Sequence, residues 1–145
     1  MQISDVLRIK GRDVVTVPPD TSVRGLLDVL AEFGIGATVV SADGETVDGI
    51  VSERDVVRGL ASRGSAILDQ EVSSIMTSEV VTAALTDHVD TLFAVMTEQR
   101  IRHLPVIVDG RLSGLVSIGD LVKRRVSELE TERDSLELYI RSTAT

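Results

Sequence analysis

Two serine–aspartate pairs are the residues of this sequence whose types and spacing could do chemistry. Ser52 and Asp55 follow one apolar segment, and Ser117 and Asp120 follow another. The spacing is typical of a capping box, in which serine and acid bond the free N–H groups at a helix start. The same atoms could hold a ligand, because a helix N-terminus favours phosphate and a first-turn carboxylate can accept both ribose hydroxyls. Both interpretations stay open.

The composition argues against several other kinds of site. The 145 residues include 15 Lys and Arg against 23 Asp and Glu, and the net charge of −8 disfavours a nucleic-acid surface. Without cysteine there is no disulfide, thiolate metal site or cysteine nucleophile. His88 and His103 lack metal-ligand spacing, and neither a P-loop nor a nucleophile elbow occurs. We predict no catalytic residue, no metal and no nucleic-acid partner.

No apolar stretch has the length of a membrane span, and none follows Met1 in the manner of a signal peptide. We therefore expect a cytoplasmic protein without a membrane partner.

The elements that must position the serine–aspartate pairs occur twice along the chain. Val80-Val81-Thr82 repeats Val14-Val15-Thr16 at an offset of about 66 residues, longer than the short solenoid repeats. The turn-forming pair Asp43-Gly44 recurs as Asp109-Gly110. Because one copy exposes an apolar sheet face, we expect the two copies to cover each other.

Each copy is predicted to run strand, helix, strand, strand, helix. In the first copy we expect strands at 14–17, 37–40 and 47–51, with helices that open at Ser22 and Ser52. In the second copy we expect strands at 80–82, 104–108 and 112–116, with helices that open at His88 and Ser117. Short apolar patterns, Ile3 to Leu7 and Val72 to Met76, precede the two copies. The fold class is α/β (α+β), with a parallel crossover and an added antiparallel strand.

The last helix is predicted to be longer than the repeat requires. From Asp120 to about Ser142 there is no glycine or proline, and apolar residues recur at alternating steps of four and three. Such a helix could lie along its own domain or dock on a partner subunit. The expected organisation is a unit at 1–66, a second at 67–126 and a helical extension at 127–145.

These motifs, together with the duplication, resemble a pair of cystathionine-β-synthase-type (CBS) domains, a Bateman module. The first copy has Gly-Ile-Val-Ser-Glu-Arg-Asp at 49–55, and the second has Arg-His-Leu-Pro-Val at 102–106 and Gly-Leu-Val-Ser-Ile-Gly-Asp at 114–120. The resemblance covers about 3–123. It implies two β-α-β-β-α units packed by their sheets around a pseudo-two-fold axis, and frequent dimerisation. It also implies an adenosine-containing ligand, such as AMP, ADP, ATP, NAD or S-adenosylmethionine, in the clefts between the units.

The resemblance further implies which residues meet that ligand. The two aspartates would hold ribose and the two serines would meet phosphate. Arg102 and His103 replace Gly36 and Ala37 of the first copy and would lie beside the phosphates, although a solvated strand edge also explains them. The full predicted ligand-binding set is Lys10, Thr16, Ile35, Ala37, Ser52, Arg54, Asp55, Thr82, Ile101, Arg102, His103, Pro105, Ser117 and Asp120. Because the copies differ, we expect two unequal sites.

The favoured function is a regulatory sensor that binds an adenine nucleotide without any catalytic step. We expect a homodimer that acts on an unidentified regulated protein. The alternative is a ligand-free homodimeric interaction protein in which the motifs serve only as helix caps. A small hydrolase acting on a bound nucleotide is a third hypothesis.

Overall fold

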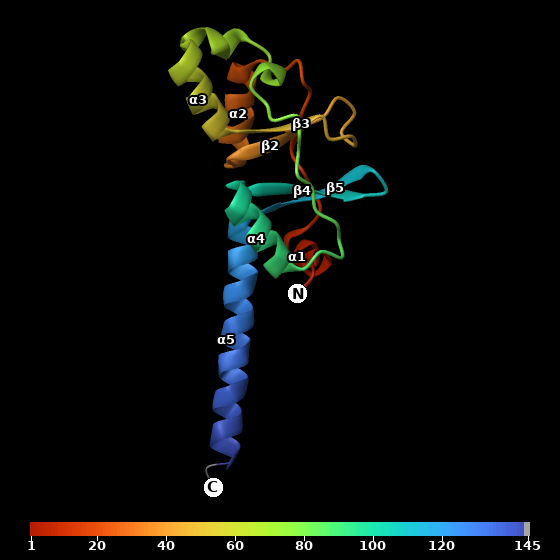
Figure 1. Ribbon diagram of the computed structural model, residues 1–145, viewed down its shortest axis with the longest axis vertical. Coiled ribbons are helices and arrows are strands. Elements are labelled where there is room, and N and C mark those ends of the chain that lie inside the picture. The colour runs from red at the N-terminus through yellow and green to blue at the C-terminus, as the bar shows by residue number, and fades with distance from the viewer. Residues whose placement is uncertain (144–145) are drawn as a thin grey trace.

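Two small αβ units form the body of the protein, with their sheets stacked against each other, and one long helix leaves the body (Figure 1). The computed structural model describes residues 1–143. Residues 144 and 145 of the predicted extension lie outside the described residues. The predicted mixed α/β class and the extended last helix are confirmed.

The first unit follows the predicted order of elements. It contains β1 (Thr16–Val17), α2 (Val23–Phe33), β2 (Ala37–Val40), β3 (Gly49–Ser52) and α3 (Glu53–Arg63). β1 pairs parallel with β2, and β2 pairs antiparallel with β3, as a crossover followed by a hairpin requires. Helix α2 starts where expected, because the Gly25 N–H donates to Ser22 Oγ at 3.0 Å.

The second unit has one regular strand fewer than predicted. It contains α4 (Val89–Gln99), β4 (His103–Val108), β5 (Arg111–Ser117) and α5 (Ile118–Thr143). The predicted strand at 80–82 is wrong, since only Ala83 forms a parallel bridge, to Val106. The Ala83 N–H donates to Pro105 O, and the next bond along this ladder would need an N–H from Pro105 itself. Proline has none, so the ladder stops there. The first unit has Val39 at this position, and Thr16 pairs with it.

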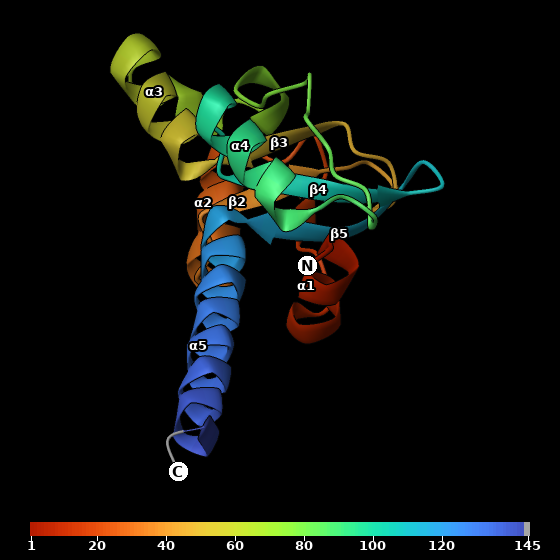
Figure 2. The ribbon, with the colours of Figure 1, turned by 60° about the horizontal axis from the view of Figure 1, so that its bottom comes forward.

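Each unit's core is completed by a segment that precedes the other copy in the sequence. Helix α1 (Ile3–Lys10) buries its apolar side in the core of the second unit. The 3₁₀ helices η1 (Ser65–Asp69) and η2 (Val72–Ser74) pack into the core of the first unit. This exchange ties the two units together (Figure 2, where α1 lies beside β5). The division of the chain at residues 66 and 126 stays a prediction.

Two glycines accommodate the exchanged segments. A Cβ at Gly114 would lie 2.8 Å from Leu7 Cδ1, and a Cβ at Gly49 would lie 2.6 Å from Met76 Sδ. Both glycines precede a serine–aspartate pair, so the repeated motif begins with the residue on which the exchanged segment packs.

Among residues 1–143, no helix combines the length and the apolar character needed to cross a membrane.

Candidate functional site

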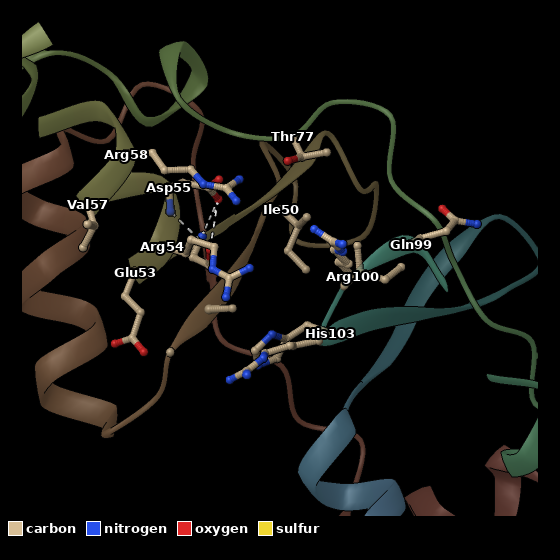
Figure 3. A pocket seen from close by; sticks show the side chains of 15 residues that line it. Ile50, Glu53, Arg54, Asp55, Val57, Arg58, Thr77, Gln99, Arg100 and His103 are labelled. Atoms are coloured by element: carbon tan, nitrogen blue, oxygen red, sulfur yellow. Dashed lines mark hydrogen bonds between the residues drawn. The ribbon is translucent and has the colours of Figure 1, made fainter. Parts of the chain in front are cut away.

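A cleft of about 880 Å³ opens between the two units, and we name it the first cleft. One wall comes from the start of β2, from β3 and from the first turns of α3, and the other comes from the end of α4 and the start of β4 (Figure 3). The lining residues are Gly36, Ala37, Ile50, Ser52, Glu53, Arg54, Asp55, Val57, Arg58, Thr77, Gln99, Arg100, Ile101, Arg102 and His103.

The N-terminus of α3 points its first turn into this cleft. The Ser52 N–H donates to Asp55 Oδ2 at 2.8 Å, and the Asp55 N–H donates to Ser52 Oγ at 3.4 Å. The capping-box interpretation is therefore confirmed for this pair. It does not exclude a ligand, because Asp55 lines the cleft and a helix N-terminus attracts anions.

Four arginines converge on the first cleft. Arg54 and Arg58 lie one turn apart on α3, and Arg100 faces them across the cleft (Figure 3). Arg102, two residues after Arg100, also lines the cleft. All four are exposed, and within residues 1–143 none of their guanidinium groups forms an ion pair. On a chain with a net charge of −8, this local gathering of cations gives a positive potential that can attract an anion with several oxygens.

Arg100 occupies its place in an unusual backbone conformation. It ends α4 with φ of 55° and ψ of 43°, the left-handed region that disfavours residues with a Cβ. The corresponding residue after α2 is Gly34, with φ of 62°. An arginine held at a strained position beside a cleft is a feature of functional sites.

His103 lies half-buried at the inner end of the cleft. Burial and the positive charges of Lys10 and Arg102 lower the pKa of His103 below its usual 6.5, although Asp120 and Glu53 act in the opposite direction. The imidazole is therefore neutral at pH 7 and can donate or accept a hydrogen bond.

The second serine–aspartate pair is bonded to a lysine from α1. Ser117 and Asp120 form the same capping box on α5, but Asp120 Oδ2 also accepts from Lys10 Nζ at 2.5 Å. Burial raises the pKa of Asp120, but hydrogen bonds from Lys10 and Ser117 outweigh it and the net pKa is lowered. Asp120 and Lys10 both line a small pocket of about 150 Å³.

The structure brings half of the predicted ligand-binding residues into the first cleft. These are Ala37, Ser52, Arg54, Asp55, Ile101, Arg102 and His103. Lys10 and Asp120 line the small pocket, whereas Thr16, Ile35, Thr82, Pro105 and Ser117 line neither space. The ligand roles of all these residues stay predictions.

Sequence reasoning missed two arginines of the cleft, although signals for both existed. Arg58 follows Arg54 by one helical turn, and Arg100 stands at the repeat position of Gly34, where a glycine would be expected after a helix.

Comparison with known proteins places this two-unit architecture in a family. A sequence model of the CBS domain matches residues 3–62 and again 72–127. The chain belongs to the CBS-domain family. The match to both copies confirms that this is a tandem CBS protein.

Individual CBS proteins resemble the chain over most of its length. A CBS-domain containing protein from Agrobacterium tumefaciens is 48% identical with a TM-score of 0.83, covering 86% of this chain and 99% of its own. A mitochondrial CBS domain-containing protein of Arabidopsis thaliana is 36% identical, and the match covers 95% of this chain and 71% of that protein. A CBS domain protein from Pyrobaculum aerophilum, solved in complex with AMP, is 32% identical with a TM-score of 0.77, covering 90% of this chain and 97% of its own.

Within this CBS pair the two repeated motifs have become unequal. Both cap a helix, but Asp55 lines the first cleft together with four arginines, whereas Asp120 is bonded to Lys10 of α1.

Proposed function

We propose that the protein is a regulatory module that binds an adenine nucleotide in the first cleft. The observation that carries this proposal is the convergence of four unpaired arginines on the helix N-terminus that bears Asp55. The arginines and the N-terminus of α3 would bind the phosphates. The carboxylate of Asp55 would accept hydrogen bonds from the ribose. The relative from Pyrobaculum aerophilum, solved with AMP, supports an adenine nucleotide as the ligand.

The charge of the cleft favours some adenosine ligands over others. AMP, ADP, ATP and NAD carry phosphate, whereas S-adenosylmethionine carries a sulfonium cation in place of phosphate. Four arginines oppose only Glu53 and Asp55 among the charged lining residues. We therefore expect affinity to rise with the number of phosphates, and S-adenosylmethionine to bind worst of these ligands.

The proposed role is signalling without a chemical step. Because the cleft is lined by both units, a bound nucleotide would favour one relative arrangement of the units. It can shift that arrangement only by its difference in affinity between the two states. We infer that the protein acts as a homodimer in the cytoplasm and conveys the shift to a regulated protein through α5.

Thermal melting with a panel of ligands tests the proposal. A nucleotide present at a hundred times its dissociation constant should add about 2.7 kcal/mol to the free energy of unfolding. We expect ATP and ADP to raise the melting temperature at concentrations where S-adenosylmethionine does not. Melting temperatures unchanged by all five ligands would instead indicate a module with empty clefts that acts only through protein contacts.

A further inference from the structure

Two acidic residues line the first cleft, and their carboxylates are used differently. Asp55 Oδ2 accepts hydrogen bonds from the Ser52 N–H at 2.8 Å and from the Ser52 hydroxyl at 3.2 Å. Glu53 is exposed, and within residues 1–143 it takes part in no ion pair. The cleft therefore holds an unpaired negative charge beside its four arginines.

The Glu53 side chain lies over the start of β2. A Cβ added at Gly36 would be 3.3 Å from Glu53 Oε1, and the Glu53 N–H donates to Gly36 O at 2.9 Å. Glu53 is also the first residue of α3, so its charge lies within one turn of the N–H groups proposed to bind phosphate. A phosphate bound at this helix N-terminus is therefore repelled by Glu53.

The second copy shows that the fold does not require an acid at this position. The Ile118 N–H donates to Arg102 O at 2.8 Å, which matches the bond from Glu53 to Gly36. At these matched positions the first copy has glutamate and glycine, whereas the second has isoleucine and arginine. Helix α5 begins at Ile118 with an equivalent capping box. The charge of Glu53 is thus not needed to start the helix.

The charge of Glu53 also acts on the opposite wall of the cleft. Burial lowers the pKa of His103, whereas the charges of Asp120 and Glu53 act to raise it. His103 belongs to β4 of the second unit, and Glu53 belongs to α3 of the first. The field of Glu53 therefore extends across the space that a ligand would occupy.

We propose that Glu53 is a specificity-determining residue of the first cleft, and that it weakens binding more strongly for ligands with more negative charge. The inference rests on the proposed function and deepens it. ATP carries about twice the negative charge of AMP near neutral pH. Two unit charges about 10 Å apart in a water-like dielectric change an affinity about twofold. The arginines favour ligands with more phosphates, and Glu53 limits that preference.

Titration of AMP and of ATP into the full chain, without Mg²⁺ and at low ionic strength, tests the role of Glu53. Glu53→Gln keeps the size of the side chain and removes its charge. We expect both affinities to rise, and the ratio of the ATP affinity to the AMP affinity to rise about fourfold. Glu53→Asp keeps the charge and should leave this ratio near its native value.

A matched control is Glu132→Gln, which removes the same charge from the half of α5 that extends away from the units (Figure 1). It should leave the affinity ratio unchanged. An unchanged or lower ratio in Glu53→Gln, or an equal rise in Glu132→Gln, would overturn the inference. A role of Glu53 in helix stability alone predicts a lower melting temperature with equal changes in the two affinities. A native chain that binds neither nucleotide would overturn the proposed function itself, and this inference with it.

Discussion

Arg100 has a strained backbone conformation and also lines the first cleft. Its effect on stability and its effect on nucleotide binding can therefore be measured separately. Its φ of 55° costs about 1 kcal/mol relative to glycine, which adopts this conformation freely. A charge-assisted hydrogen bond to phosphate contributes about 1.5–3 kcal/mol. If Arg100 binds phosphate as proposed, the backbone strain lowers stability while the side chain contributes to affinity.

We predict that Arg100→Gly raises the melting temperature of the free protein and weakens ATP binding about tenfold or more. Differential scanning calorimetry and a binding titration measure the two effects. Gly34→Ala, at the matching position of the first unit with φ of 62°, serves as the control and should lower the melting temperature. A lower melting temperature for Arg100→Gly would contradict the strain argument.

We predict that nucleotide binding is coupled to proton uptake by His103. Its pKa is lowered below 6.5 by burial and by the cations Lys10 and Arg102, and a bound phosphate would raise that pKa by adding negative charge. A group whose pKa rises on binding takes up a proton, so affinity should increase as pH falls from the pKa of the bound state toward the lower pKa of the free state. NAD is the suitable probe, because its phosphodiester groups do not titrate in this range.

The measurement is NAD affinity against pH in the native chain and in His103→Gln. We expect the native affinity to rise as pH falls and the variant's to change little. Equal pH dependence in both proteins would show that His103 does not couple NAD binding to proton uptake.

At the scale of single residues, the sequence predicted the capping boxes because both partners lie three residues apart. It could not predict that Lys10 bonds Asp120 of the second capping box, because the two residues are 110 positions apart. Only the packing of α1 on the second unit brings them together.

Among the elements, the segments that precede each copy pack on Gly49 and Gly114, and these two glycines have different surroundings. At Gly49 an added Cβ would lie 2.9 Å from the backbone oxygen of Thr77, whereas at Gly114 it would meet only the end of the Leu7 side chain. A backbone atom cannot move aside as a side chain can. Overpacking typically costs about 1–3 kcal/mol.

We therefore predict that Gly49→Ala destabilises the protein at the upper end of this range and more than Gly114→Ala does. Urea unfolding of the two variants at pH 7 measures the difference. Equal destabilisation would show that the contact at β3 relaxes as easily as that at β5.

The bond between α1 and α5 should depend on pH. Lys10 and Asp120 are 36% and 26% exposed, so we expect Lys10→Met to cost about 1 kcal/mol at neutral pH. The pKa of Asp120 is lowered in the folded state, so its contribution is present above pH 3.8 and is lost as pH falls through the folded pKa. The cost of Lys10→Met should therefore shrink in acid.

Urea unfolding at neutral and acidic pH tests this expectation. Arg8→Met is the control, because the Arg8–Asp5 pair on the same helix is far more exposed and should contribute little. A cost for Lys10→Met that is unchanged at low pH would mean that lost packing, and not the ion pair, sets the effect.

Element order was largely predictable because hydrophobic spacing and turn residues determine it locally. The packing of α1 on the second unit was not predictable. The segments Ile3 to Leu7 and Val72 to Met76 carry similar apolar patterns, so either could complete either core. The missing strand of the second unit was signalled by Pro105, which cannot donate the N–H that a longer ladder needs.

For the whole molecule, the duplication gave two similar units whose clefts now differ. The first unit places Asp55 in a cationic cleft, whereas in the second unit Asp120 is bonded to Lys10. We therefore predict a single nucleotide per chain, although the sequence repeat alone would allow two.

Calorimetric titration of ATP into the full chain measures how many nucleotides bind and where, with Asp55→Asn and Asp120→Asn as the paired variants. Both substitutions keep an oxygen that can cap the helix and remove the carboxylate charge. We predict one ATP per chain, lost or greatly weakened in Asp55→Asn and retained in Asp120→Asn. Two ATP per chain, or binding lost only in Asp120→Asn, would contradict the assignment of the nucleotide to the first cleft.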